Sequence, residues 1–398
     1  MALLFCLPGY PALGNGASNE SSSEIVAAAN NTFGISLLQQ IATNNSGANL
    51  FISPYSASVA LEMICAGAEG TTQSQMQEVL GTSGAQQNQI NEGNKEIVDF
   101  INRKNTNFTL STANALWYQN GLSIKPAFLA VNQQFFGAKV AAVNFYNPDS
   151  ATAINSWASG ATGGKITNVV SYPFDPAPSL LLANAVYFKG NWQTPFSTNL
   201  TVSSPFQLLA GQETVPMMNQ TGTFLYAQTN GYQAVQLPYK GGNLAMYLFL
   251  PGTNSSVPSL LQTIANIGWA EASQQGFSEQ SGALSLPRFN LDTSENFIPP
   301  LEALGMKNAF SSSPGVADFQ NISTTYPLYI SSVNQKAIIQ VDETGSEAAA
   351  LTTIGVTASC VMTPLTPPFS MIVNRPFLFL IEDQETGTIL FAGIVFKP

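Results

Sequence analysis

The 398-residue sequence contains no histidine. Without histidine, the chain lacks the general base of a Ser-His-Asp or Cys-His catalytic site. It also lacks the commonest side-chain ligand of transition metals, so we expect neither a metal centre nor a cofactor. The chain has 23 Asp and Glu, which leaves a carboxylate-pair hydrolase open on composition. Because no motif marks such a pair, we do not expect an enzyme.

Basic residues are also scarce. The chain has 13 Lys and Arg, none of them before Lys95, and a net charge of −10 at pH 7. Nucleic acids, heparin-like polyanions and acidic membranes all bind to basic clusters, so none of them is an expected partner. No apolar run approaches the roughly 18 residues that span a bilayer. The sequence therefore predicts a soluble globular protein.

The three cysteines give no disulfide framework, because Cys6, Cys65 and Cys360 are an odd number without regular spacing. Cys65 lies in the apolar stretch LEMICAGA and is predicted to be a buried small hydrophobe.

The N-terminus MALLFCLPGYPALG resembles part of an export signal, although its apolar core is short and no basic residue precedes it. Eight Asn-x-Ser/Thr sequons lend weak support to secretion. They lie at Asn19, Asn30, Asn44, Asn107, Asn199, Asn219, Asn254 and Asn321. We expect a leader-like or disordered segment at 1–22 and an extracellular protein, with a cytoplasmic location as the alternative.

Residues 23–398 are predicted to form a single domain. Apolar residues at helical spacing predict a helix over Ser23–Thr43, and a second helix is expected over Ser53–Ala68, with Ser53 and Pro54 as cap and first turn. Later segments are typical of strands, and several are apolar on both faces and therefore central. These strands are expected at 108–119, 180–190, 232–240, 244–251, 283–291 and 336–343. Since no linker or repeat divides the chain, we predict one large α+β domain.

Seven stretches follow one another in an order that is typical of one protein family. They are NLFISPYSASVALEMICAGAEGTT (49–72), ATGGKITNVV (161–170), LLLANAVYFKGNWQTPF (ending at Phe196), VPMM (215–218), LPRF (286–289), ADFQNIS (317–323) and NRPFLFLIED (374–383). On these stretches the chain resembles the serpins from about Ser23 to Pro398.

The resemblance implies a serpin fold with three β-sheets, eight or nine helices and an exposed reactive loop at about 343–370. It also implies a metastable native state and a monomeric inhibitor of serine endopeptidases. A protease that cleaves the loop is trapped as an acyl-enzyme when the loop inserts into the central sheet as an extra strand. The alternative is a non-inhibitory serpin that acts as a carrier, chaperone or storage protein.

The resemblance also implies residues that control the opening of the central sheet. The family often places a histidine below the opening point, where this chain has Gln335. Gln335 can still bridge Ser53 and Asn184 by hydrogen bonds, but it does not titrate. At the head of the loop, the resemblance implies an ion pair between Glu343 and Arg288 near Trp192.

The stretch ETGSEAAALTTIGV (343–356) contains the hinge that must insert. In isolation its alanines favour a helix, but in this position we predict an inhibitory hinge. Strand periodicity places Ser346, Ala348 and Ala350 on the inward face, where small side chains can slide between strands. Gly345 supplies a pivot. The predicted hinge comprises Glu343, Gly345, Ser346, Glu347, Ala348, Ala349 and Ala350.

Family spacing places the scissile bond at Ser359–Cys360. The alternatives are Ala358–Ser359 and, ranked third, Met362–Thr363, because three extra residues add roughly 10 Å of slack to the inserted strand. Between Lys336 and Arg375 the chain has no Lys or Arg. A trypsin-like protease requires a basic side chain, so the expected target is elastase-like or subtilisin-like.

Overall fold

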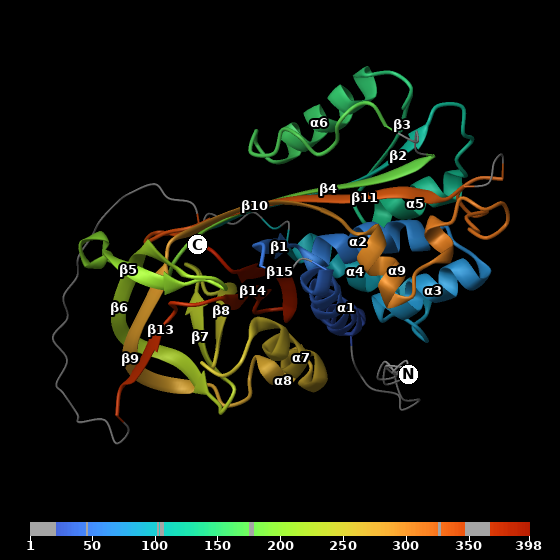
Figure 1. The fold of residues 1–398 in the computed structure, drawn as a ribbon. Coiled ribbons are helices and arrows are strands. Elements are labelled where there is room, and N and C mark those ends of the chain that lie inside the picture. The colour runs from blue at the N-terminus through green and yellow to red at the C-terminus, as the bar shows by residue number, and fades with distance from the viewer. Residues whose placement is uncertain are drawn as a thin grey trace, which may run out of the picture.

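The structure is a computed structural model that describes residues 21–44, 47–101, 103, 107–174, 179–324, 328–346 and 367–398. Helices and strands are both abundant in these residues, which confirms the predicted α+β class. Figure 1 shows most of the helices gathered at one end, beneath a long sheet, and a strongly curved group of strands at the other end.

The long sheet has six strands. Their order is β10 (Phe289–Asn296), β11 (Ile330–Val341), β12 (Gly345–Ser346), β4 (Leu180–Asn191), β2 (Phe108–Gln119) and β3 (Lys139–Val143). Strands β4 and β11 run parallel and pair directly from Ile330↔Leu180 to Ile338↔Tyr187. Most other pairs in this sheet are antiparallel.

Both faces of β4 are covered, which explains its uninterrupted apolar sequence. Leu181 and Ala183 pack in a cluster with Ile154 of α6 (Asp149–Ala161), which lies on the outer face of the sheet (Figure 1). Leu180 and Leu182 belong to the main core on the opposite face. That face rests on α2 (Pro54–Cys65) and the helices around it.

The second hydrogen-bonded network has nine strands. Along its path lie β1 (Leu50–Ile52), β15 (Thr388–Val395), β14 (Phe377–Asp383), β8 (Leu244–Pro251), β7 (Tyr232–Pro238), β6 (Gln212–Gln228), β9 (Ser278–Pro287) and β13 (Phe369–Ile372), with β5 (Val202–Gln207) paired to β6. The 17-residue β6 pairs with β5 at its start and with β7 at its end. Strand β6 thus connects two groups of paired strands. Together with the six-stranded sheet, these two groups correspond to the three expected sheets.

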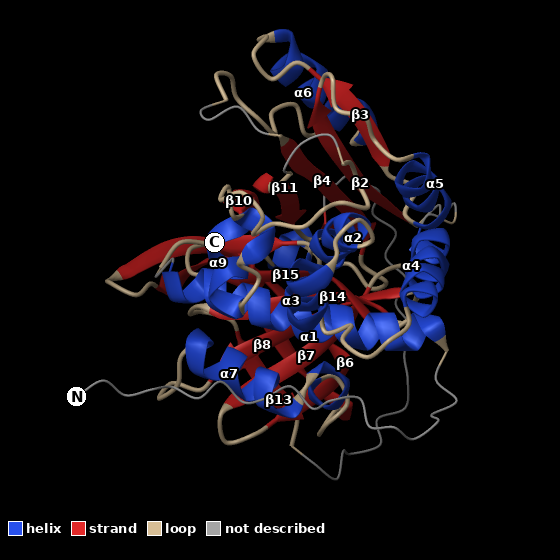
Figure 2. Ribbon diagram, turned by 90° about the vertical axis from the view of Figure 1, so that its right-hand side faces the viewer, coloured by secondary structure: helices blue, strands red, loops and turns tan. Residues whose placement is uncertain are grey.

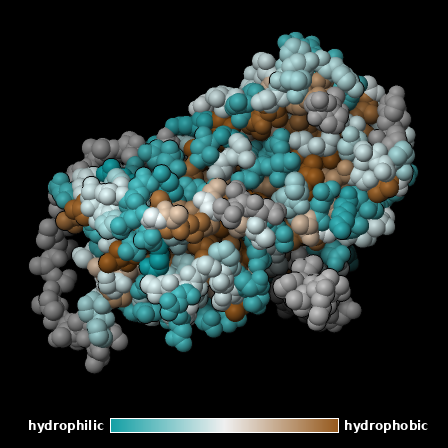
Figure 3. Space-filling model, viewed as in Figure 1, coloured by the Kyte–Doolittle hydropathy of each residue, from teal (hydrophilic) through white to brown (hydrophobic). Residues whose placement is uncertain are grey.

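The remaining helices are α1 (Ser22–Asn44), α3 (Gly70–Leu80), α4 (Gln87–Ile101), α5 (Pro126–Phe135), α7 (Val257–Ile267), α8 (Trp269–Ala272) and α9 (Ile298–Leu304). Figure 2 shows α1, α3 and α9 packed close together next to the strands of the nine-stranded network. Within the described ranges, no helix is both long and apolar enough to cross a membrane. In Figure 3, hydrophilic side chains cover most of the visible face and hydrophobic ones form small scattered groups.

Three predicted elements differ from those observed. The strand expected at 283–291 is two strands, because the chain leaves one sheet at Arg288 and enters the other as β10. The second helix ends at Cys65 rather than Ala68, since its last turn tightens into bonds from Gly67 N to Ile64 O and from Ala68 N to Cys65 O. Strand β11 begins six residues earlier than expected and ends at Val341.

Candidate functional site

The head of the predicted loop lies inside the six-stranded sheet. Gly345 and Ser346 form β12 between β4 and β11, antiparallel to both. Direct pairing of β4 with β11 stops at Ile338↔Tyr187, and beyond this point the two strands separate to admit β12. Gly345 and Ser346 thus form a short strand between β4 and β11 at this end of the sheet.

A close crossing of two glycines makes this entry possible. Gly345 has a φ of +151°, and a Cβ there would lie 2.0 Å from the Gly190 carbonyl oxygen and 2.6 Å from the Asn191 Cα. Backbone atoms cannot yield to such contacts, so only glycine fits at position 345. The structure thus gives Gly345 a requirement for close backbone approach, and its role as a flexible pivot stays a prediction.

Ser346 is fully buried, and its hydroxyl forms a 2.9 Å hydrogen bond with the hydroxyl of Tyr239. Burial raises the pKa of Tyr239, so its phenol stays neutral. The Tyr239 ring stacks on Trp192 with the ring centroids 4.6 Å apart. Tyr239 thus links the side chain of Ser346 to the ring of Trp192.

Trp192 and Phe196 hold the backbone that leads into β12. The Trp192 indole N–H donates to the Asp342 carbonyl oxygen at 2.9 Å, and its main-chain N–H donates to that of Thr344 at 2.9 Å. The Phe196 N–H donates to the Glu343 carbonyl oxygen at 2.8 Å. These bonds fix the direction in which the chain enters the sheet.

Glu343 and Arg288 form an ion pair at the same end of the sheet. Arg288 Nε donates to both carboxylate oxygens at 2.9 Å, and Nη2 lies 2.5 Å from Oε1. The Thr201 hydroxyl is a further donor to the carboxylate. Burial works to raise the pKa of Glu343, but the bonds from Arg288 and Thr201 outweigh it and hold the pKa below its usual value. We call Trp192, Tyr239, Arg288, Glu343 and Ser346 the loop-head contacts.

A second group of polar residues lies buried beneath the sheet. The Gln335 side chain accepts from Ser53 N–H at 2.7 Å and donates to the Ser53 carbonyl oxygen at 3.0 Å and to Asn184 Oδ1 at 2.7 Å. Ser53 also caps α2, because its hydroxyl accepts from the Ser56 N–H at 3.2 Å. Gln335 therefore lies between Ser53 and Asn184, at the position where the resemblance implied a bridge.

Sequence reasoning missed several partners. Asn184 also donates to the hydroxyl of Ser56 and to Asn114, which lies opposite it on β2. A polar residue in the middle of the apolar stretch TANALWY was the available signal for Asn114. No signal in the sequence pointed to Tyr239. We call Ser53, Ser56, Asn114, Asn184 and Gln335 the buried network.

The rest of the predicted site lies outside the described residues. This applies to the hinge residues Glu347–Ala350 and to Ala358, Ser359, Cys360 and Met362. Cys65 is buried, and burial raises the pKa of its thiol, as expected for an inert residue. Among the residues whose placement is described, no group of three His, Cys, Asp or Glu could hold a metal ion.

Comparisons with known proteins agree with this architecture. A family model described as Serpin (serine protease inhibitor) matches residues 28–398. The leukocyte elastase inhibitor of Bos taurus is 34% identical over 94% of this chain and 100% of its own length. An uncharacterized serpin-like protein of Thermococcus kodakarensis is 34% identical over 95% of this chain and 87% of its own.

Solved structures give the same result. The native thermophilic serpin Tengpin superposes with a TM-score of 0.85 at 27% identity, covering 96% of both chains. Serpin48 of the insect Tenebrio molitor, described as a highly specific serpin, gives a TM-score of 0.83 at 28% identity over 96% of this chain and 100% of its own.

Proposed function

This chain belongs to the serpin family, and we propose that it inhibits serine proteases as a suicide substrate. The observation that carries the proposal is β12, in which Gly345 and Ser346 occupy the first two positions of an additional strand. Further insertion along the same line would separate β4 from β11 and place the hinge between them.

The geometry of the sheet supplies a driving force for this insertion. Where β4 and β11 pair directly they are parallel, whereas an inserted strand is antiparallel to both, as β12 is. Each inserted residue thus exchanges one parallel pairing for two antiparallel ones, and parallel pairing is slightly less stable per residue. Direct pairing of β4 with β11 comprises eight residue pairs. At a net value of about 1 kcal/mol per hydrogen bond, their replacement favours the inserted state by several kcal/mol. The native state is then metastable and persists because the barrier is high.

The protease stays covalently attached because loop insertion comes before hydrolysis of the acyl-enzyme. The protease serine oxygen attacks the carbonyl carbon of Ser359, an ester forms, and the Ser359–Cys360 peptide bond breaks as the Cys360 nitrogen takes a proton. The freed loop inserts before water hydrolyses the ester, and it carries the attached protease to the far end of the sheet. Small residues at Ala348 and Ala350 are what allow fast insertion.

The expected target is an elastase-like or subtilisin-like protease. The segment from 337 to 374 has no Lys or Arg, so a trypsin-like pocket finds no basic side chain. Similarity to leukocyte elastase inhibitors of cattle and humans supports the same choice. The proposed partners include neither nucleic acid nor a heparin-like polyanion, because the chain carries a net charge of −10.

We further propose that residues 23–398 form one domain that acts outside the cell as a monomer, preceded by a leader-like segment at 1–22. The sequons give less support than their number suggests, since the side chain of Asn30 is buried in α1 and accepts from the Ser58 hydroxyl. Those at Asn199 and Asn254 are exposed. Sequencing the N-terminus of the protein from its source separates this proposal from the cytoplasmic alternative.

The test of inhibition is an adduct that survives SDS. Incubation with elastase or subtilisin should give a band at the summed mass of the two proteins, whereas trypsin should give none. Mass spectrometry of the released C-terminal peptide identifies which of the three candidate bonds is cut. If both target proteases cleave the loop without forming an adduct, the inhibitory function is excluded and a non-inhibitory serpin remains.

A matched pair of variants tests the insertion step. Ala348→Arg places a charge on the inward face and should convert the inhibitor into a substrate, because the charge must be desolvated as the sheet closes. Ala349→Arg carries the same charge on the outward face and should retain most of the adduct. Equal stoichiometries of inhibition for the two variants would contradict insertion in this register.

A further inference from the structure

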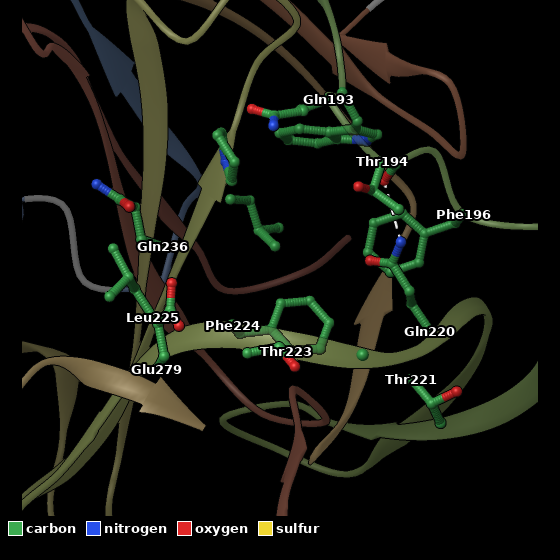
Figure 4. A pocket seen from close by; sticks show the side chains of 14 residues that line it. Gln193, Thr194, Phe196, Gln220, Thr221, Thr223, Phe224, Leu225, Gln236 and Glu279 are labelled. Atoms are coloured by element: carbon green, nitrogen blue, oxygen red, sulfur yellow. Dashed lines mark hydrogen bonds between the residues drawn. The ribbon is translucent and has the colours of Figure 1, made fainter. Parts of the chain in front are cut away.

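A cavity of about 370 Å³ lies beside the loop-head contacts. Its walls come from the segment Trp192–Phe196 that follows β4, from the middle of β6 and from the end of β7. Figure 4 shows the rings of Phe196 and Phe224 bordering the open space, with Leu225, Gln236 and Glu279 on one side and Gln220 on the other. A cavity of this size is within the range of small-molecule sites in proteins.

One wall of the cavity is directly connected to the residues that hold the loop. Trp192 lines the cavity with one part of its surface and stacks on Tyr239 with another. Pro238 also lines it, accepts from the Gln193 N–H at 2.9 Å and immediately precedes Tyr239. The Tyr239 hydroxyl in turn bonds Ser346. A ligand in the cavity therefore contacts Trp192 and Pro238. Both of these residues adjoin Tyr239, which bonds the Ser346 side chain.

The other wall is held to the first by side-chain bonds. Gln220 Nε2 donates to the Thr194 carbonyl oxygen at 3.1 Å and to that of Pro195 at 3.4 Å. Opening the top of the sheet must move Trp192, because its indole N–H is bonded to Asp342 at the start of the loop. The cavity should consequently change shape when the sheet opens, so a ligand that fits the closed form opposes opening.

The lining determines which ligand fits. Phe196, Phe224 and Leu225 offer apolar surface, and Gln193 and Gln236 offer amide groups. Glu279 is the one ionisable group of the lining, which contains no Lys or Arg. Aromatic walls favour a planar aromatic ligand, and a carboxylate in a chain of net charge −10 favours a cation over an anion.

We propose that this cavity is a regulatory site for a small aromatic molecule with an ammonium group, and that its occupation slows opening of the sheet. The regulatory part rests on the proposed inhibitory function, whereas binding itself can be measured without a protease. The ligand acts through Trp192 and Tyr239 on Ser346, and it need not touch the loop.

Binding is tested on the full chain with tryptamine as the probe and indole-3-propionate as its anionic counterpart. Tryptamine should bind with a Kd on the order of 1 mM by calorimetry, from the usual affinity per ligand atom, and indole-3-propionate should bind at least several-fold more weakly. Glu279→Gln should weaken tryptamine binding about threefold. Glu271→Gln, which removes an exposed carboxylate of α8 outside the cavity, should leave it unchanged.

Coupling is tested by warming the protein and following its polymerisation, in which the loop of one molecule enters the sheet of another. Tryptamine at ten times its Kd should slow polymerisation up to about tenfold, by mass action on the closed form. Tyr239→Phe should bind tryptamine equally well but show a smaller slowing. Gly222→Trp, which adds a ring on the face of β6 that carries Phe224 and Gln220 and meets no close contact at its Cβ, should abolish both effects.

The outcomes separate the two proposals. Failure to form an SDS-stable adduct removes the inhibitory function and leaves the binding result intact. If the adduct forms but tryptamine does not bind, or if both probes bind equally, the inference about the site is wrong. If tryptamine binds in a Glu279-dependent manner and polymerisation is not slowed, the cavity is not coupled to the loop and the regulatory role is excluded.

Discussion

The buried network and the loop-head contacts both hold the six-stranded sheet together, but by different physical means. Gln335 and Asn184 are neutral amides that are almost completely buried. In contrast, Glu343 and Arg288 form an ion pair in which the Arg288 side chain is 43% exposed and that of Glu343 only 5%. One region depends on the satisfaction of every buried hydrogen bond, and the other on charge and on the packing of Trp192 and Tyr239.

This difference determines how each region can fail. A buried amide that loses its partner leaves donors and acceptors unsatisfied away from water, which costs about 1–3 kcal/mol per group. A half-exposed pair loses less, because water and salt screen the remaining charge. Loss of the buried network should therefore cost the closed sheet the most stability. Loss of the loop-head contacts should cost less, and the sheet should open first at the end where these contacts lie.

The largest effect is expected from Gln335→Ala. This change leaves the Ser53 N–H and the Oδ1 of Asn184 without partners, whereas the Ser53 carbonyl oxygen still accepts from the Ala57 N–H. Two unsatisfied buried groups should lower the unfolding free energy by about 4 kcal/mol. Denaturant unfolding measures the loss. Gln340→Ala, on the exposed face of the same strand, is the control and should change stability by less than about 0.5 kcal/mol. Similar losses for both variants would show that the network is not critical.

The next effect concerns pH and Glu62, which lies on the helix that Ser53 caps. Glu62 is buried and accepts from the Thr82 hydroxyl at 3.1 Å, and its second oxygen has no partner. Burial raises the pKa of this carboxyl to about 7. The folded state binds the proton more tightly than the unfolded state, so stability should be full below about pH 4.5 and fall by about 3 kcal/mol as pH rises to 7.

Thermal unfolding at pH 5 and pH 7.5 tests this prediction. Glu62→Gln keeps an acceptor for Thr82 and should reduce the difference between the two pH values, while the part due to Glu382 and Asp383, whose pKa values are also raised by burial, should stay. Glu78→Gln, at an exposed position of α3, should retain it. Glu343 should behave in the opposite way, because its lowered pKa means that its pair is intact at both pH values and weakens only below the usual carboxyl range.

A smaller loss of stability, with a distinct consequence, is expected from Glu343→Lys. The change puts two positive charges together at the head of the loop and should cost about 2 kcal/mol. Because the contacts at the entrance are lost while the buried network is intact, the variant should polymerise on mild warming before it unfolds. Light scattering during a heating series measures this, and the charge-swapped pair Glu343→Arg with Arg288→Glu should restore a monomer. A Glu343→Lys protein that stays monomeric up to its unfolding temperature would contradict the role of this pair.

The smallest effect is expected from Tyr239→Phe. The buried hydroxyl of Ser346 then loses its partner, which should cost about 1 kcal/mol. The Ser346→Ala change removes both the donor and the acceptor at that position, and the double variant should be no less stable than Tyr239→Phe alone. A double-mutant cycle measures the interaction, and two strictly additive losses would show that the two hydroxyls do not interact.

Much of the fold could be predicted from local sequence. Strands such as 108–119 and 244–251 were found at their observed bounds, because their apolar patterns reflect burial in any sheet. The opening helix differed by one residue at each end. The break at Arg288 was not predicted, since ALSLPRFNL is uniformly typical of a strand and nothing local marks the passage from one sheet to the other.

The candidate site, like the fold, could be predicted from the sequence only in part. The sequence by itself determined the family through seven ordered motifs, the small residues of the hinge, and the pairs Glu343–Arg288 and Gln335–Asn184 that the resemblance implied. Only the tertiary structure decided that Ser346 enters the sheet, that Tyr239 meets it and that a cavity borders Trp192. The bond between Tyr239 and Ser346 joins residues 107 positions apart, and such long-range neighbours depend on how complete sheets pack and not on any local pattern.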